Sequence, residues 1–329
     1  MKRVFQLSFI AFALFGFILN PPHGNAAIQT NYTGTWSSDF KPEKPEKLYL
    51  SFERKTEKGH NQNGSAWEYS DLQGLTREQT AGSGAVSFRI VREAGTIDCE
   101  GRFDNNKGAG TFRFTPNQSF VIAMKTRGFD FTENKNGREN DVENRLFTAT
   151  NINLTTAFAD DLLSANFGNL TVEELFKAKI FNVTSQFMRE MKATGFPNLG
   201  MEELVKARIF KIDADFVKRV ATMGFKDQSM ESLVKMSIFK ISPEFINEVQ
   251  DQGFNNLAIE QLVKLRTFKI DAAFIKEIKA EGYNNISVEE LVKMKIFKID
   301  SAFIRKAKVD KTVPDVEELV RMKIGVRTR

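Results

Sequence analysis

Two sets of lysines recur at one spacing along the C-terminal half of the chain. Within each set, successive members are 29 residues apart. An array of stacked units would align each set into a row, which could meet an acidic protein, anionic lipid headgroups or cell-wall polymers. The simpler interpretation is solvated charge that favours the negative end of a helix dipole. The first set is Lys206, Lys235, Lys264 and Lys293, and the second is Lys211, Lys240, Lys269 and Lys298.

Paired carboxylates are the other recurrent feature that could do chemistry. Adjacent glutamates stand at 173–174, 202–203 and 289–290, and a carboxylate pair can act as general acid and base. Their periodic recurrence favours a different role, in which acids in the first turn stabilise the positive end of a helix.

Residue types for other catalytic or metal chemistry are scarce. The chain has two histidines and one cysteine. His60 lies in a polar stretch and His23 in the N-terminal segment, whereas Cys99 alternates with Ile97 in an expected strand and should be buried. One histidine and one cysteine cannot complete a structural zinc site. The sequence therefore predicts no catalytic residue, no metal site and no cofactor.

The elements that must position the lysines are helices in a repeat. A leucine anchors each copy, and this strict period predicts stacked supersecondary units that bury a shared core. About seven units are expected over 116–329, with degenerate ends and a charged insertion near 132–140. The anchors are Leu175, Leu204, Leu233, Leu262 and Leu291.

One copy of the repeat illustrates the two expected helices. Asp271 should cap the first helix, and Gly282 should end it in a left-handed conformation. Ser287 and Glu290 form a capping box for the second helix. The apolar stripe of that second helix is expected to comprise Val288, Leu291, Val292 and Ile296.

The segment 28–115 has the alternation of half-buried strands. Apolar residues recur at every second position around Phe52, Phe88 and Phe114. The polar stretch 54–84 predicts a long loop or weak strands, and 104–108 predicts a hairpin turn. The fold class is thus α+β with two domains: a small antiparallel β-sandwich or roll, followed by an α-solenoid of 29-residue two-helix repeats.

The N-terminus has the layout of a secretory signal peptide over 1–27. Lys2 and Arg3 precede an apolar run, and small residues follow it, which predicts cleavage near Ala26 or Ala27. The expected location is the periplasm or the outside of the cell. The alternative is an uncleaved segment that anchors the chain in a membrane.

The charge balance bears on the kind of partner. The net charge is +5, but 47 basic residues face 42 acidic ones, and each repeat carries both signs. A nucleic-acid-binding protein concentrates its basic residues on one face, so the sequence predicts no nucleic-acid partner. Contact with a membrane surface and the oligomeric state are left open.

The motif GYNNISVEELVKMKIFKIDSAFI and the preceding VSFRIVREAGTIDCEGRFDNNKGAGTFRFTPNQSF resemble parts of a known bacterial family. They are similar to the extracytoplasmic tails of penicillin-sensor-like antirepressor membrane metallopeptidases, over roughly 30–329. The chain has neither the membrane bundle nor the HExxH motif of those enzymes. The resemblance therefore implies an envelope-exposed sensory or interaction module without peptidase activity.

Three functional hypotheses follow from these observations. The leading one is a non-enzymatic, exported scaffold that binds a protein partner of the cell envelope through the helical repeats. The second is recognition of cell wall, glycan or peptide by the β-domain, with Trp36, Trp67 and Tyr69 as stacking surface, although core roles are favoured for these residues. The third is a hydrolase that uses acidic residues of the β-domain.

Overall fold

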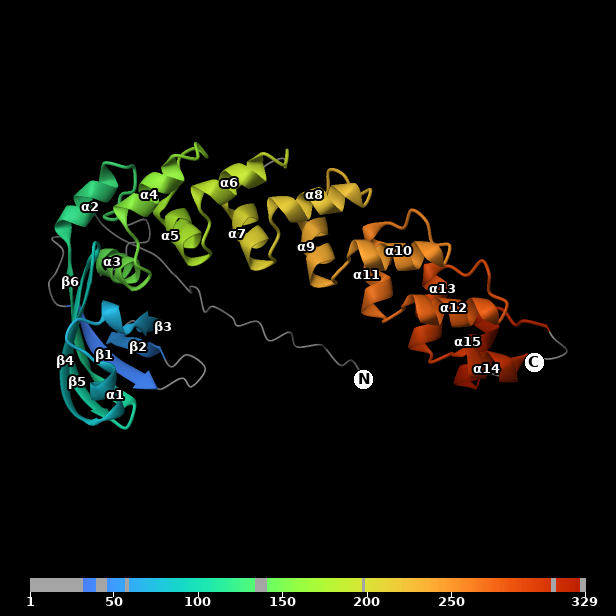
Figure 1. Cartoon of the computed structure of the whole chain (residues 1–329), viewed down its shortest axis with the longest axis horizontal. Coiled ribbons are helices and arrows are strands. Elements are labelled where there is room, and N and C mark those ends of the chain that lie inside the picture. The colour runs from blue at the N-terminus through green and yellow to red at the C-terminus, as the bar shows by residue number, and fades with distance from the viewer. Residues whose placement is uncertain are drawn as a thin grey trace. The chain divides into compact units, whose positions relative to one another are not determined.

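The computed structural model describes residues 32–39, 46–56, 59–133, 141–196, 199–308 and 312–325. The predicted signal peptide and most of the charged insertion lie outside these residues. The chain divides into two compact units, 1–180 and 181–329. An antiparallel sheet lies in the first unit, and pairs of helices continue through the second (Figure 1), which confirms the predicted α+β class.

The first unit is built on one curled antiparallel sheet of six strands. The strand order is β3-β2-β1-β6-β5-β4, so two three-stranded meanders meet where β1 pairs with β6. Buried and exposed side chains alternate along the strands, as the sequence predicts. The strands are β1 Tyr32–Asp39, β2 Lys47–Thr56, β3 Gly59–Glu68, β4 Ser83–Arg92, β5 Gly95–Asp104 and β6 Lys107–Pro116.

The segment 54–84 is more ordered than its composition indicates. It contains the strand β3, a 3-10 turn at Tyr69–Asp71 and a short helix α1 at Arg77–Ala81. Of the two predicted alternatives, a long loop or weak strands, the structure has the strand, because β3 pairs along its whole length with β2. The predicted hairpin is confirmed: Asn105 and Asn106 have φ of 46° and 68° between β5 and β6.

Aromatic side chains fill the buried face of the sheet. The Trp36 indole lies against Gly101 and Gly110, which face each other across β5 and β6. A Cβ at Gly110 would stand 2.0 Å from the Glu100 carbonyl oxygen, so only glycine fits there. Trp36 Nε1 donates a hydrogen bond of 3.1 Å to that same carbonyl.

Helices cover the sheet and complete the first unit. From α3, Phe147 stacks on Phe112 and Tyr32, with ring centroids 5.2 and 5.0 Å apart. This places an aromatic cluster between the sheet and the helix. The helices of this unit after α1 are α2 Gln118–Lys125, α3 Asp141–Asn151, α4 Thr156–Leu163 and α5 Val172–Ile180.

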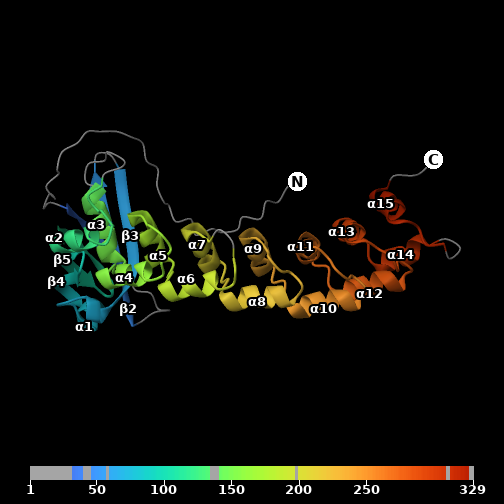
Figure 2. The ribbon, with the colours of Figure 1, turned by 90° about the horizontal axis from the view of Figure 1, so that it is seen from above.

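The second unit is an array of helix pairs. Its even-numbered helices form one row and its odd-numbered helices another (Figure 2). The first helices of the pairs are α6 Ser185–Lys192, α8 Ala214–Thr222, α10 Pro243–Asp251, α12 Ala272–Ala280 and α14 Ser301–Ala307. The second helices are α7 Met201–Ile209, α9 Met230–Ile238, α11 Ile259–Thr267, α13 Val288–Ile296 and α15 Val316–Ile324.

The predicted helix ends are confirmed in this unit. The Asp271 carboxylate accepts a hydrogen bond from the Phe274 N–H, and Ser287 and Glu290 form a reciprocal capping box. Gly282 has a φ of 106°, and the equivalent glycines are also left-handed. Local sequence thus defines where most of these helices begin and where the first helices α6 to α12 end.

Candidate functional site

The second helices of the array end in one recurrent structure. Helix α7 ends at Ile209, and Phe210 and Lys211 form the turn that follows it. The next side chain, Ile212, is buried. The Ile212 N–H donates to the Ala207 carbonyl at 2.8 Å, and the Lys211 N–H donates to the Arg208 carbonyl at 3.3 Å. This is a Schellman ending, with lysine where glycine is usual.

The lysine edge, formed by Lys211, Lys240, Lys269 and Lys298, repeats this conformation. The four residues have φ between 51° and 54°, which costs a residue with a Cβ roughly 1 kcal/mol relative to glycine. All four side chains are exposed, and none forms an ion pair or side-chain hydrogen bond within the described part of the chain. At the same repeat position, Asn153 and Asn182 are also left-handed.

An aliphatic row runs beside the lysine edge. It comprises the last helical residues Ile209, Ile238, Ile296 and Ile324, which are 49 % to 55 % exposed. Thr267 holds this position in α11 and interrupts the row.

The exposure of Ile296 contradicts its predicted place in a buried stripe. The core face of α13 is Val288, Leu291 and Met294, each at most 2 % exposed. At 3.6 residues per turn, Ile296 lies ~140° around the helix from Leu291, and it therefore faces away from that core.

Stacked cations hold the ends of the second helices in place. The Arg208 guanidinium lies 3.8 Å from the centroid of Phe187, and Arg266 lies 3.7 Å from that of Phe245. Arg266 also donates to the carbonyl of Lys240 at 3.1 Å, which satisfies a carbonyl at the end of the previous second helix. The backbone of the edge at Lys240 is thus held by a hydrogen bond from the next repeat.

The first set of lysines has a different environment. Lys235 pairs with Glu260 at 3.2 Å and Lys264 with Glu289 at 2.8 Å, each bridging adjacent repeats. Lys293 pairs with Glu317 in the same way. The hydrogen bond from Lys264 is the largest cause of a pKa below the ordinary range at Glu289.

Lys206 begins this set without such a bridge. It forms no ion pair among the residues that the structure describes. Three of the four lysines in the first set are therefore engaged within the chain, whereas the second set is available to solvent along its whole length.

The paired glutamates divide into two structural roles. Glu289 forms the bridge to the preceding repeat, while Glu290 caps its own helix through Ser287. In the first unit, Glu173 pairs with Arg145, and Glu174 caps through Thr171. The pairs that the sequence presents as neighbours are thus turned toward different partners.

The proposed stacking residues of the β-domain lie largely inside it. Trp36 and Trp67 are buried, which confirms the core role predicted for them. Tyr69 is half-buried and shares a hydrogen bond of 2.9 Å with Thr80. The binding hypothesis for this domain consequently loses its two largest aromatic surfaces.

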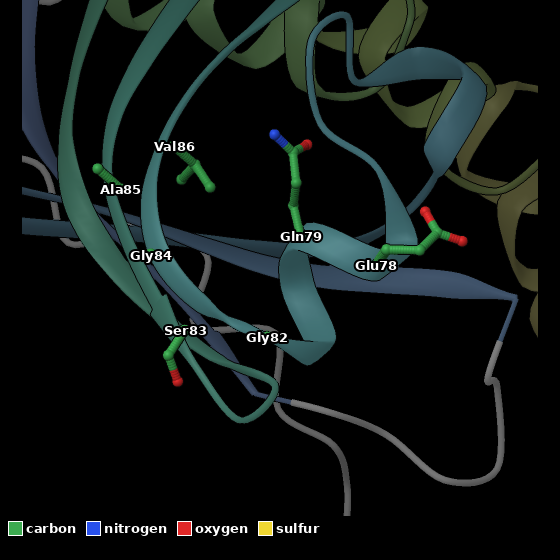
Figure 3. A pocket seen from close by; sticks show the side chains of 7 residues that line it. All are labelled: Glu78, Gln79, Gly82, Ser83, Gly84, Ala85 and Val86. Carbon is green, nitrogen blue, oxygen red and sulfur yellow. The ribbon is translucent and has the colours of Figure 1, made fainter.

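A shallow hollow of about 330 Å³ lies between α1 and the start of β4 (Figure 3). Glu78 is its one ionisable lining residue, beside Gln79, Ser83 and small side chains. A hydrogen bond from its own backbone N–H, followed by one from the Thr76 side chain, lowers the pKa of Glu78. The lining of the hollow does not contain the carboxylate pair that is usual in glycoside hydrolysis.

Comparisons with family models, with curated proteins and with solved structures give no match to this chain. The resemblance to metallopeptidase tails therefore stays a prediction. Within the described ranges, no helix is long and apolar enough to cross a bilayer.

Two features of the edge escaped prediction from the sequence. The left-handed lysines were missed because lysine carries no conformational signal comparable to Gly282. The aliphatic row was missed because Ile296 was assigned to the core stripe. The usable signal is Ile-Phe-Lys at 209–211, 238–240 and 296–298, after the stripes of those helices have already supplied their core residues.

Proposed function

We propose that the protein is an exported, non-enzymatic interaction module that binds a protein partner of the cell envelope through the lysine edge. The observation that carries this proposal is the repetition of an exposed lysine at a left-handed position in four successive repeats. Backbone strain that persists where glycine would relieve it is a feature of functional positions. Export rests on the N-terminal sequence.

The charge pattern supports a protein partner over a polyanion. Asp213, Asp271 and Asp300 each follow a lysine of the edge by two residues, and each carboxylate caps a first helix. Positive charge is therefore spaced along the edge and interrupted by negative charge. A partner with its own spaced acidic side chains complements such a surface better than a continuous phosphate backbone.

The chain itself supplies the substitution that tests this function. Asparagine occupies the same position at Asn153 and Asn182 and tolerates the left-handed conformation. We expect the fourfold Lys→Asn variant of the lysine edge to remain folded and to lose its partner in a crosslinking pull-down from the cell envelope. The partner would be identified by mass spectrometry.

A matched variant controls for net charge. Replacing Lys218, Lys226, Lys276 and Lys306 with glutamine removes the same four charges from positions on or next to the first helices. This control should retain the partner. Equal capture by the wild type and the Lys→Asn variant would refute a role for the lysine edge.

A further inference from the structure

The aliphatic row and the lysine edge together specify the chemistry of the bound segment. We propose that they bind an extended acidic segment of the partner that presents an aliphatic side chain at every third residue. This inference rests on the proposed function and deepens it.

The aliphatic row supplies the apolar part of the surface. Single exposed apolar residues are ordinary on proteins, but here four of the five second helices expose isoleucine at the same last position. Nothing in the helix requires it, because Thr267 ends α11 equally well. The recurrence thus marks a line of apolar contacts along the array, interrupted once at Thr267.

The spacing of the helices determines the period of the segment. Successive second helices pack directly on one another from α7 to α15, and packed helices lie about 8–10 Å apart. A chain in the polyproline II conformation advances about 9.3 Å in three residues and returns to the same face. An extended segment of this kind can therefore place one side chain against each isoleucine.

The lysine edge determines the charge of the segment. Each lysine lies two residues after the row position, as Lys211 does after Ile209 and Lys298 after Ile296. An acidic side chain next to each aliphatic one would meet these exposed lysines. Preformed extended chains also lose little conformational entropy on binding.

A peptide is favoured over a membrane surface by the shape of the row. The row is one residue wide, is interrupted at Thr267, and contains no tryptophan or tyrosine. Helices that lie in a membrane interface present a broad apolar face with aromatic anchors. The row provides a line of contacts instead of such a face.

The test uses the full chain without its signal segment. The probe is a labelled synthetic peptide of five Glu-Pro-Ile triplets, one for each second helix. Binding is measured by fluorescence anisotropy, with three comparison probes. These are a peptide of the same composition with its isoleucines contiguous, a Lys-Pro-Ile peptide, and vesicles of phosphatidylcholine and phosphatidylglycerol. We expect binding of the Glu-Pro-Ile peptide alone. Equal binding of the contiguous peptide, or binding of the vesicles in its place, would overturn the inference.

Substitutions that exchange isoleucine and threonine locate the contact. Changing all four residues of the aliphatic row to threonine should weaken peptide binding about tenfold, because each loses apolar contact area. Thr267→Ile completes the row and should tighten binding about threefold on the same basis. Ile122→Thr, at an isoleucine of α2 that is 58 % exposed, is the matched control and should have no effect.

The two proposals fail separately. If the fourfold threonine variant still captures the envelope partner while the Lys→Asn variant does not, this inference is wrong and the proposed function stands. If the Lys→Asn variant also captures it, both are wrong.

Discussion

The contacts that stabilise the sheet of the first unit join residues far apart in sequence, whereas those in the helical array of the second unit join residues of the same or the next repeat. Strand β1 pairs with β6, so Tyr32 lies opposite Phe114, and the core joins residues from both meanders. In the array, Arg266 contacts Phe245 within one repeat, and Lys264 pairs with Glu289 of the next repeat. Non-local pairing makes a unit cooperative, whereas neighbour contacts make an array of nearly independent steps.

The two units also differ in whether their distinctive side chains are buried or exposed. The sheet encloses its distinctive side chains, including Trp36 and Cys99. The array exposes a left-handed lysine in four successive repeats and, in most of them, an isoleucine beside it. A repeated surface of this type can be extended or interrupted one repeat at a time.

The largest expected effect comes from cavities in the two cores. Trp36→Ala should destabilise the whole sheet by ~3–5 kcal/mol, and Leu291→Ala should cost ~2–5 kcal/mol within the array. Both tryptophans lie in the sheet. In urea, the unfolding transition that tryptophan fluorescence reports should therefore be the same for Leu291→Ala as for the wild type. Hydrogen exchange should quicken only in the repeats near Leu291, and faster exchange in the sheet would contradict the independence of the units.

The second prediction concerns the buried thiol of the sheet. Burial raises the pKa of Cys99 above its ordinary value of 9.0. The stability that this shift contributes is complete below pH 9.0 and is lost as the pH rises toward the higher folded value, since only the unfolded thiol ionises there. About one pH unit above 9.0 the loss should be ~1.4 kcal/mol.

Cys99→Val tests that loss directly. Urea midpoints of the Trp67 fluorescence transition would be compared at neutral pH and in that alkaline window. The variant should lose less stability between the two conditions than the wild type does. An equal loss in both proteins would exclude the thiol as the cause.

The third prediction concerns glycine at the lysine edge. Lys240→Gly should stabilise the array by about 0.5–1 kcal/mol, since relief of the left-handed conformation outweighs the added freedom of the unfolded chain. The measurement is the thermal transition by far-ultraviolet circular dichroism, with Lys235→Gly, inside α9, as a control that should destabilise. A lower midpoint for Lys240→Gly would show that the position is not strained.

The smallest effect is expected at the bridges between repeats. Lys264→Glu and Glu289→Lys should each destabilise by ~0.2–1 kcal/mol, because both side chains are about half exposed, and the double exchange should restore stability. The lowered pKa of Glu289 implies that the bridge is present above the ordinary value of 4.5 and is lost as the pH falls through the folded value. A double-mutant cycle in low and high salt measures this, and zero coupling would remove the bridges as a stabilising feature.

Much of the fold could be predicted because its signals are local. Ser287 with Glu290, Asp271, and the glycines such as Gly282 act within one helical turn, so the sequence is sufficient to locate the helix ends. Alternation along Val86, Phe88 and Ile90 similarly predicts a strand with one buried face. For 54–84 the sequence predicts either a long loop or weak strands, because the polar composition of β3 hides its pairing with β2, which is a contact between segments.

The sequence by itself determined the repeat, its caps and the two sets of lysines. Only the tertiary structure decided that Lys264 is bridged to Glu289 while Lys269, five residues later, is left-handed and exposed. The same holds for Ile296, whose exposure depends on where Leu291 meets the neighbouring helices. A period in the sequence aligns residues of one type, but the direction of each side chain and the partner it finds depend on how adjacent repeats pack.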